Sequence, residues 1–134
     1  MNGNRYLIKG AHVFTMDPVV GELDRADVLI EGNQIAAVGS DLGYVDARVL
    51  DGNDRIVLPG FVDTHRHMWQ TAMRGYGADW TLTQYFVWYY LEHGKKFRPE
   101  DIHAGNLLSA VESLDAGVTT TVDWSHGLQT VDHA

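Results

Sequence analysis

The first 58 residues alternate short apolar runs with turn residues, a spacing that is typical of β-strands. Asp17-Pro18 marks one turn, and Gly32-Asn33 is a two-residue loop of the kind that joins antiparallel strands, because both residues tolerate positive φ. A second hairpin is predicted around residues 51–54. We therefore expect a small antiparallel β module. Its predicted strands are residues 6–9, 13–16, 27–31, 34–38, 48–50 and 55–58.

After His67 the apolar positions change to a helical period. Residues 68–76 and 82–93 carry apolar and aromatic side chains at positions three and four residues apart. A further helix is predicted to begin at Pro99 and to end before Gly117, since proline suits the first helical position and glycine the C-terminal cap. Its predicted buried stripe is Ala104, Leu107, Leu108, Val111 and Leu114.

A β-branched strand, residues 118–122, follows that helix, so the order is now strand, helices, strand. This order is one βαβ crossover and predicts parallel pairing of the two strands. Polar residues follow both strands, His65 and His67 after the first and Asp123 and His126 after the second. Because α/β proteins build their sites at the carboxyl ends of parallel strands, we expect the two clusters to be neighbours. For His126 two interpretations stay open, a pocket-lining residue and an ordinary loop residue.

The two histidines of the first strand form the clearest candidate metal site. Side chains alternate along a strand, so His65 and His67 share one face, about 7 Å apart, while Arg66 faces the other way. Two imidazoles at this spacing can converge on one divalent cation, and Asp63 on the same face can orient an imidazole from behind. The alternative is an accidental pair of histidines, which is disfavoured by the context Pro59-Gly60-Phe61-Val62-Asp63-Thr64-His65-Arg66-His67.

The region after His67 is also the most aromatic part of the chain. Its rings either wall a pocket for a flat substrate or form the packing face of the helices. We favour packing for these rings in general and the pocket for Trp69, because Trp69 lies two residues past His67. The set is Trp69, Trp80, Trp88, Tyr89 and Tyr90.

Composition narrows the chemistry further. The 134 residues are 45% hydrophobic and 21% charged, as in an ordinary globular protein. Without cysteine, a transition-metal site must rely on histidine, and disulfides and thiolate nucleophiles are excluded. The formal net charge of −8 argues against a nucleic-acid partner. No apolar segment resembles a signal peptide or approaches the ~20 residues of a membrane span, so we expect a cytoplasmic protein without membrane contact.

Taken together, these motifs resemble the amidohydrolase superfamily. The similar stretches are the β module and Ile56-Val57-Leu58 leading into the His65-Arg66-His67 motif, then Gln70, Met73-Arg74-Gly75 and, some fifty residues on, Ala116-Gly117-Val118-Thr119-Thr120. The most similar branch holds cytosine deaminase-like and triazine chlorohydrolase-like enzymes, with adenosylhomocysteine and guanine deaminases. The His-x-His motif is specific to such enzymes, and the Ala-Gly-Val-Thr-Thr stretch is supporting only.

The resemblance implies a function and a set of site residues. His65 and His67 would be metal ligands for one Zn²⁺ or Fe²⁺ per site, with Asp63 behind them, and Trp69, Gln70 and His126 would border the substrate pocket. The implied reaction is hydrolytic deamination, or related C–N or C–Cl hydrolysis, of a planar nitrogen heterocycle by a metal-activated water. The implied enzyme is a metal-dependent hydrolase acting on carbon–nitrogen bonds other than peptide bonds.

The resemblance also implies an α/β fold, a (β/α)8 barrel with a small β-sandwich domain. Residues 1–58 would be the amino-terminal part of a composite sandwich and residues 59–134 the start of the barrel, with its first two strands and the intervening helices. Such a barrel takes ~250 residues, whereas 76 follow residue 58. The third metal histidine, the proton-shuttling histidine, the water-activating carboxylate and the aspartate ligand would lie on later strands, so no catalytic residue is expected here.

Unpaired strand edges and an uncovered helix stripe would leave apolar surface in water. We therefore expect the 134 residues alone to be unstable or self-associated and inactive, and the remainder of the polypeptide or a complementing chain to complete them. Besides the small-molecule substrate, a homo-oligomer is expected for the full-length form. Two alternatives are a non-catalytic amidohydrolase-like scaffold protein and a small β-rich binding module.

Overall fold

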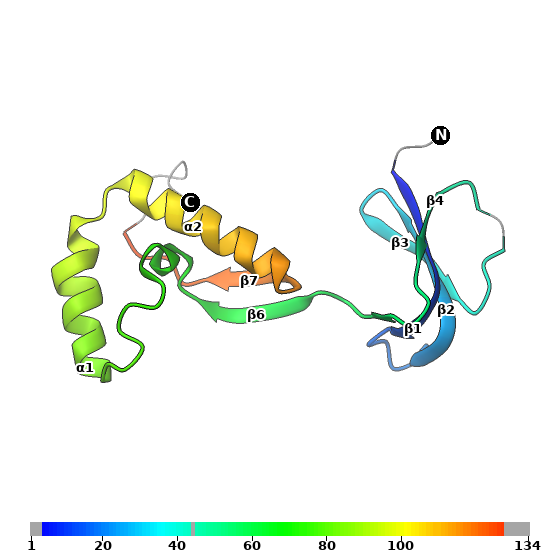
Figure 1. The fold of residues 1–134 in the computed structure, drawn as a ribbon, viewed down its shortest axis with the longest axis horizontal. Coiled ribbons are helices and arrows are strands. Elements are labelled where there is room, and N and C mark those ends of the chain that lie inside the picture. The colour runs from blue at the N-terminus through cyan, green and yellow to red at the C-terminus, as the bar shows by residue number, and fades with distance from the viewer. Residues whose placement is uncertain (1–3, 44, 128–134) are drawn as a thin grey trace. The chain divides into compact units, whose positions relative to one another are not determined.

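The computed structural model of the chain describes residues 4–43 and 45–127 (Figure 1). The chain forms two compact units, Met1–Pro59 and Gly60–Ala134. The first is a β-sheet unit, and the second contains a pair of strands and all of the described helices. No helix in the described ranges is both long enough and apolar enough to cross a membrane.

The first unit is built on a five-stranded sheet. Its strands in sequence are β1 (Arg5–Phe14), β2 (Glu22–Glu31), β3 (Gln34–Gly39), β4 (Arg48–Asp51) and β5 (Ile56–Val57). β2 pairs antiparallel with β1 on one side and β3 on the other, which confirms the predicted hairpin. At its turn Gly32 has a φ of +63°, in the left-handed region that glycine enters without steric cost.

Two strand predictions are wrong. Residues 6–9 and 13–16 were predicted as separate strands, but β1 is continuous from Arg5 to Phe14, with irregular register between Ile8 and Ala11. The second hairpin does not form, because β4 and β5 both pair parallel to β1. Between them the chain loops out without reversing, and the Gly52 N–H donates to the Lys9 carbonyl over 2.8 Å.

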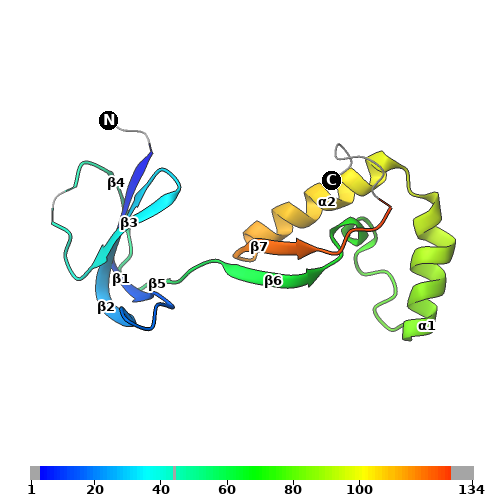
Figure 2. The same cartoon turned by 180° about the vertical axis from the view of Figure 1, so that it is seen from behind.

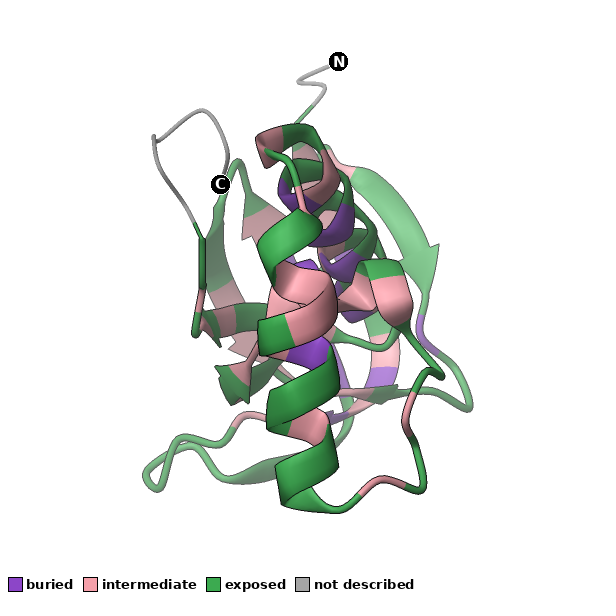
Figure 3. Cartoon of the chain, turned by 90° about the vertical axis from the view of Figure 1, so that its left-hand side faces the viewer, coloured by how far each residue is buried: buried purple, intermediate pink, exposed green. Residues whose placement is uncertain are grey.

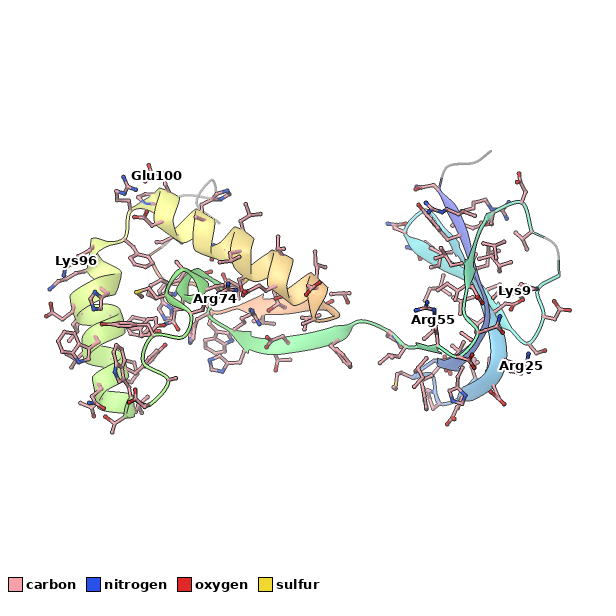
Figure 4. All side chains as sticks on the ribbon, viewed as in Figure 1. Lys9, Arg25, Arg55, Arg74, Lys96 and Glu100 are labelled. Atoms are coloured by element: carbon pink, nitrogen blue, oxygen red, sulfur yellow. The ribbon has the colours of Figure 1, made fainter. Side chains whose placement is uncertain are left out.

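A buried carboxylate holds the irregular part of β1. Asp27 on β2 is 2% exposed and accepts the Gly10 N–H at 2.9 Å, the Leu42 N–H at 3.1 Å and the ammonium of Lys9 at 3.2 Å (Figure 4 labels Lys9). Burial alone would raise the pKa of Asp27, but these three donors together hold it below the usual aspartate value. The carboxylate therefore ties the β1 irregularity to the loop after β3. The hydrophobic core beside it is Ala11, Val13, Ala26 and Val28.

The second unit contains the predicted βαβ crossover. β6 (Phe61–Arg66) and β7 (Val118–Asp123) pair in parallel, as Figure 2 shows from the direction of both arrows. The connection begins with a 3₁₀ turn, η1 (Met68–Met73). A continuous helical segment then consists of α1 (Leu82–Tyr85), the π-helical η2 (Phe86–His93) and the 3₁₀ turn η3 (Gly94–Lys96). α2 (Pro99–Asp115) completes the connection and lies along one face of the strand pair (Figure 1).

The buried face of α2 differs from the predicted one. Leu107, Val111 and Leu114 are 59%, 57% and 66% exposed, and Ala104 and Leu108 are exposed as well. The helix buries a face of small and polar residues together with one isoleucine. Figure 3 shows that the buried stretches, in purple, are short and are interrupted by exposed ones. The buried residues are Ile102, Gly105, Asn106, Ser109 and Ser113.

The close approach of α2 to η1 explains which face of the helix is buried. A Cβ on Gly105 would lie 2.4 Å from the Trp69 carbonyl oxygen, so α2 can pack on η1 only through a glycine. Four residues on, Ser109 accepts a 2.7 Å hydrogen bond from Arg66 Nε of β6. The apolar stripe remains uncovered among the described residues, because the small face is the one that fits η1 and β6.

Candidate metal and substrate site

His65 near the end of β6 and His67 directly after the strand lie on the same side. Arg66 points toward α2, where it donates to Ser109, so the alternation of the strand places His65 and His67 on the opposite side. Their imidazole rings lie 5.2 Å apart, centroid to centroid, in an edge-to-face arrangement. The structure thus brings the predicted metal ligands together at the carboxyl end of β6.

The residue after β7 fixes the orientation of both rings. The Trp124 carbonyl lies 2.7 Å from His67 Nδ1, and the Trp124 N–H donates to the Arg66 carbonyl over 2.7 Å. The indole of Trp124 stacks on the His65 ring at 4.9 Å and donates its Nε1–H to the Thr64 carbonyl at 3.3 Å. Sequence reasoning missed Trp124, although its position directly after a strand that ends at the candidate site is a usable signal.

This arrangement fits a metal. Metal-binding histidines commonly donate one ring N–H to a carbonyl, which fixes the tautomer and leaves the other nitrogen for the ion. The Trp124 carbonyl at His67 Nδ1 is such a partner and leaves Nε2 for the metal. Within residues 4–43 and 45–127, no group of three or more His, Asp or Glu side chains is placed to hold an ion. Among the described residues, His65 and His67 would therefore make up a half-site of two ligands.

Asp63 has contacts other than an imidazole. Its carboxylate accepts the backbone N–H of His65 at 3.1 Å and lies 3.5 Å from the guanidinium of Arg66. It therefore shapes the backbone that carries the first histidine. Asp123 has a comparable role at the end of β7, where it accepts the Met68 N–H at 3.0 Å and a hydrogen bond from the Ser125 hydroxyl. The hydrogen bond from Met68 ties the start of η1 to the end of β7.

His126 lies among rings from three segments. Its imidazole is 5.0 Å from the His67 ring, 5.1 Å from Tyr90 and 6.3 Å from Trp69. Desolvation lowers the pKa of His126 below the usual histidine value, and the adjacent His67 imidazole adds to this shift. His126 also lines a cavity of about 190 Å³. The other lining residues are Trp69, Tyr90, Gly94, Ile102 and Gly127.

Trp69 is a packing residue that also contacts the cavity. It is 3% exposed and forms a core with Tyr89 and Ile102. Its indole Nε1–H is buried and has no hydrogen-bond partner among the described residues. Trp69 therefore packs in the core and also lines the cavity, and its role toward a substrate stays a prediction.

Gln70 is held by two tyrosines. Its amide Nε2 donates to the Tyr85 hydroxyl at 2.7 Å and to the Tyr90 hydroxyl at 3.2 Å. The Gln70 backbone N–H donates to the His67 carbonyl at 3.1 Å, which places this residue one turn from the predicted metal half-site. Sequence reasoning did not identify Tyr85 as a partner, because the contact depends on how the helical segment is wound.

Curated relatives match most of the chain. The 5'-deoxyadenosine deaminase of Methanosarcina barkeri is 33% identical over 117 residues, which is 87% of this chain and 27% of the relative. The 5-methylthioadenosine/S-adenosylhomocysteine deaminase of Pelotomaculum thermopropionicum is 32% identical over 129 residues, 93% of this chain and 30% of the relative. The chain thus spans less than a third of the length of these proteins.

Solved structures of hydrolases are also similar to most of the chain. A triazine hydrolase from Arthrobacter aurescens superposes with a TM-score of 0.81 at 32% identity, over 91% of this chain and 29% of that one. A mutant atrazine chlorohydrolase from Arthrobacter aurescens, complexed with zinc and atraton, gives 0.73 at 32% identity over 88% and 28%. No family model matches the chain. These similarities in sequence and structure confirm the predicted resemblance of the chain to the amidohydrolase superfamily.

Proposed function

We propose that the full-length protein carrying this chain is a metal-dependent hydrolase that removes an exocyclic group from a planar nitrogen heterocycle. Deamination is the favoured reaction, because relatives about one third identical are named deaminases of adenosine-type compounds. A triazine hydrolase of similar identity supports the broader class of C–N or C–Cl hydrolysis. In this proposal the 134 residues supply one part of the active site and are inactive alone.

The proposal assigns each unit a place in a larger fold. Residues 1–58 contribute strands to a composite β-sandwich domain, and residues 59–134 begin a (β/α)8 barrel with β6 and β7 as its first two strands. The parallel pairing of β6 with β7 and the covering helix α2 support this assignment. The remainder of the same polypeptide, or a complementing chain, would supply the later strands and the other metal ligands.

The observation that carries the proposal is the pair of imidazoles at the end of β6. His65 and His67 would hold one Zn²⁺ or Fe²⁺, and zinc is present in the atrazine chlorohydrolase structure. When bound, such a metal activates water for attack on an sp² ring carbon. The Trp124 carbonyl would hold the His67 ring in the metal-binding tautomer, and the Trp124 indole would hold His65 by stacking.

The other site residues would shape the space for the heterocycle. His126 lies beside His67 and the Tyr90 ring packs on His126, and the two rings would exclude water from one side of the ligand. Trp69 would support them from the core, and Gln70 would present a polar group to the ring. Asp63 would act indirectly, through the backbone of His65.

The test measures metal content and product release in the full-length protein. About one zinc or iron per chain is expected, with release of ammonia from an adenosine-type substrate or of chloride from a chlorotriazine. His65→Ala and His67→Ala should each lose most of the metal and the turnover. His103→Ala is the matched control, because His103 lies exposed on α2, and it should retain both. A metal-free protein without turnover on these substrates would contradict the proposal and favour a scaffold role.

A further inference from the structure

Gln70, Tyr85 and Tyr90 form a closed triangle of polar atoms. Besides the two hydrogen bonds from the Gln70 amide nitrogen, the two tyrosine hydroxyls lie 3.0 Å from each other. All three side chains are half-buried. The helix is π-helical from Phe86 onward, and this winding makes the contact possible. Residues five apart lie about 140° apart around an α-helix, whereas π-helical winding brings such residues close to one face.

Counting hydrogens fixes the orientation of the amide. With Nε2 toward the tyrosines, its two hydrogens serve one hydroxyl each, and one hydroxyl donates to the other, so all three contacts are satisfied. With the amide reversed, Oε1 would offer no hydrogen. Only the two hydroxyl hydrogens would then remain for three contacts. The triangle is therefore complete only when the nitrogen of Gln70 faces inward.

The outward group of Gln70 is then an acceptor. Oε1 makes no hydrogen bond to the described residues, whose contacts with Gln70 all use Nε2 or the backbone N–H. Gln70 follows His67 within one turn, and the ring of its partner Tyr90 packs at 5.1 Å on His126. Gln70 thus belongs, through Tyr90 and His126, to the same cluster of side chains as the proposed metal half-site.

We propose that Tyr85 and Tyr90 are positioning residues that lock Gln70 as a hydrogen-bond acceptor, and that the site thereby selects heterocycles with an N–H on an amino or alkylamino substituent. The inference rests on the proposed function and adds a determinant of substrate choice to it. A freely rotating glutamine could pair equally well with an N–H donor, through its oxygen, and with an acceptor nitrogen, through its NH₂ group. The clamped amide discriminates, because a ligand without the N–H leaves Oε1 unpaired in a desolvated site.

The test compares two probes that differ by one N–H. The probes are 6-(methylamino)purine riboside and 6-(dimethylamino)purine riboside, and their dissociation constants are measured by calorimetry on the full-length protein. The wild type should prefer the methylamino probe by about tenfold, the size of one hydrogen bond to a fixed partner. Tyr85→Phe/Tyr90→Phe should reduce this preference to about twofold or less, with unchanged metal content. In turnover the loss should appear in KM, with kcat nearly constant.

Control variants separate the effect of the Tyr85 and Tyr90 hydroxyls from general effects of substitution in this unit. Tyr76→Phe removes a hydroxyl near His93 on the same unit and should keep the wild-type preference. Gln70→Met should abolish the preference directly, and it serves together with single Tyr85→Phe if the double variant fails to fold. A double variant that keeps the tenfold preference, or a wild type that prefers the dimethylamino probe, overturns the inference. Failure of the proposed function is distinct, because it appears as absent metal and turnover in the wild type.

Discussion

The two units differ in where their apolar residues lie. In the β unit, Ala11, Val13, Ala26 and Val28 form a buried cluster, and a buried carboxylate ties the sheet to its loop. In the second unit, much of the apolar surface of α2, β6 and β7 is exposed. On the strands, Phe61 is 57% exposed, Val62 62% and Val122 50%, which is similar to the exposure of the apolar stripe of α2. Large apolar side chains are exposed in both units, and the candidate chemistry lies in the unit that exposes more of them.

The largest effect should come from separating the chain from any remaining polypeptide. We expect the isolated 134 residues to self-associate through the stripe of Leu107, Val111 and Leu114, because exposed apolar patches of this kind promote association. Replacing these three residues with glutamine should lower the apparent mass in analytical ultracentrifugation severalfold, whereas His103→Gln on the same helix should not. A monomeric wild-type chain with a sharp cooperative unfolding transition would contradict this prediction.

The next largest effect concerns the packing of α2. Gly105→Ala should destabilise the full-length protein by about 2–3 kcal/mol, because the added methyl would lie 2.4 Å from the Trp69 carbonyl oxygen. This loss would occur although alanine has a helix propensity about 1 kcal/mol better than glycine. Urea unfolding measures the change, and Ala104→Ser, exposed on the same turn, should stay within about 0.5 kcal/mol. A stabilised Gly105→Ala protein would mean that α2 does not pack closely on η1.

In the β unit the comparable test is Asp27→Asn. The amide keeps the shape but loses the charge that accepts from Lys9 and two backbone N–H groups, so a loss of about 2 kcal/mol is expected at pH 7. Because the pKa of Asp27 is lowered by folding, its contribution is full above the unfolded value near 3.8 and is lost as the pH falls through the folded value. Urea midpoints between pH 2 and 7 should therefore depend less on pH in Asp27→Asn. Exposed Asp46→Asn should leave this dependence unchanged.

The sequence predicted features that depend on neighbouring residues. Gly32-Asn33 indicated the β2–β3 hairpin, and Pro99 and Gly117 indicated the ends of α2. The strand, helix, strand order indicated that β6 and β7 are parallel. In each case one local rule of turn, cap or connection decides the outcome, so distant contacts do not compete with it.

Features that depend on distant partners were not predictable in the same way. The sequence of residues 48–58 does not indicate that both short strands pair with β1, because this pairing depends on an available edge of a strand about forty residues earlier. The buried face of α2 follows from a glycine that fits η1, and hydrophobicity alone favoured the opposite face. The contact of His67 with Trp124 uses a backbone carbonyl. Because every residue has one, no pattern of side chains predicts this contact.

The smallest expected effect concerns His12 on β1. Hydrogen bonds to Asp24 at 3.3 Å and Glu22 at 2.6 Å raise the pKa of His12 above its usual value of 6.5. A raised pKa means that the stabilisation is full below pH 6.5 and disappears as the pH rises through the folded value. Proton NMR of the His12 ring should show this raised pKa, and Asp24→Asn should lower it. Because the groups are exposed, the urea midpoint should hardly change, in contrast to Asp27→Asn. An unshifted His12 titration would show that these hydrogen bonds do not persist in solution.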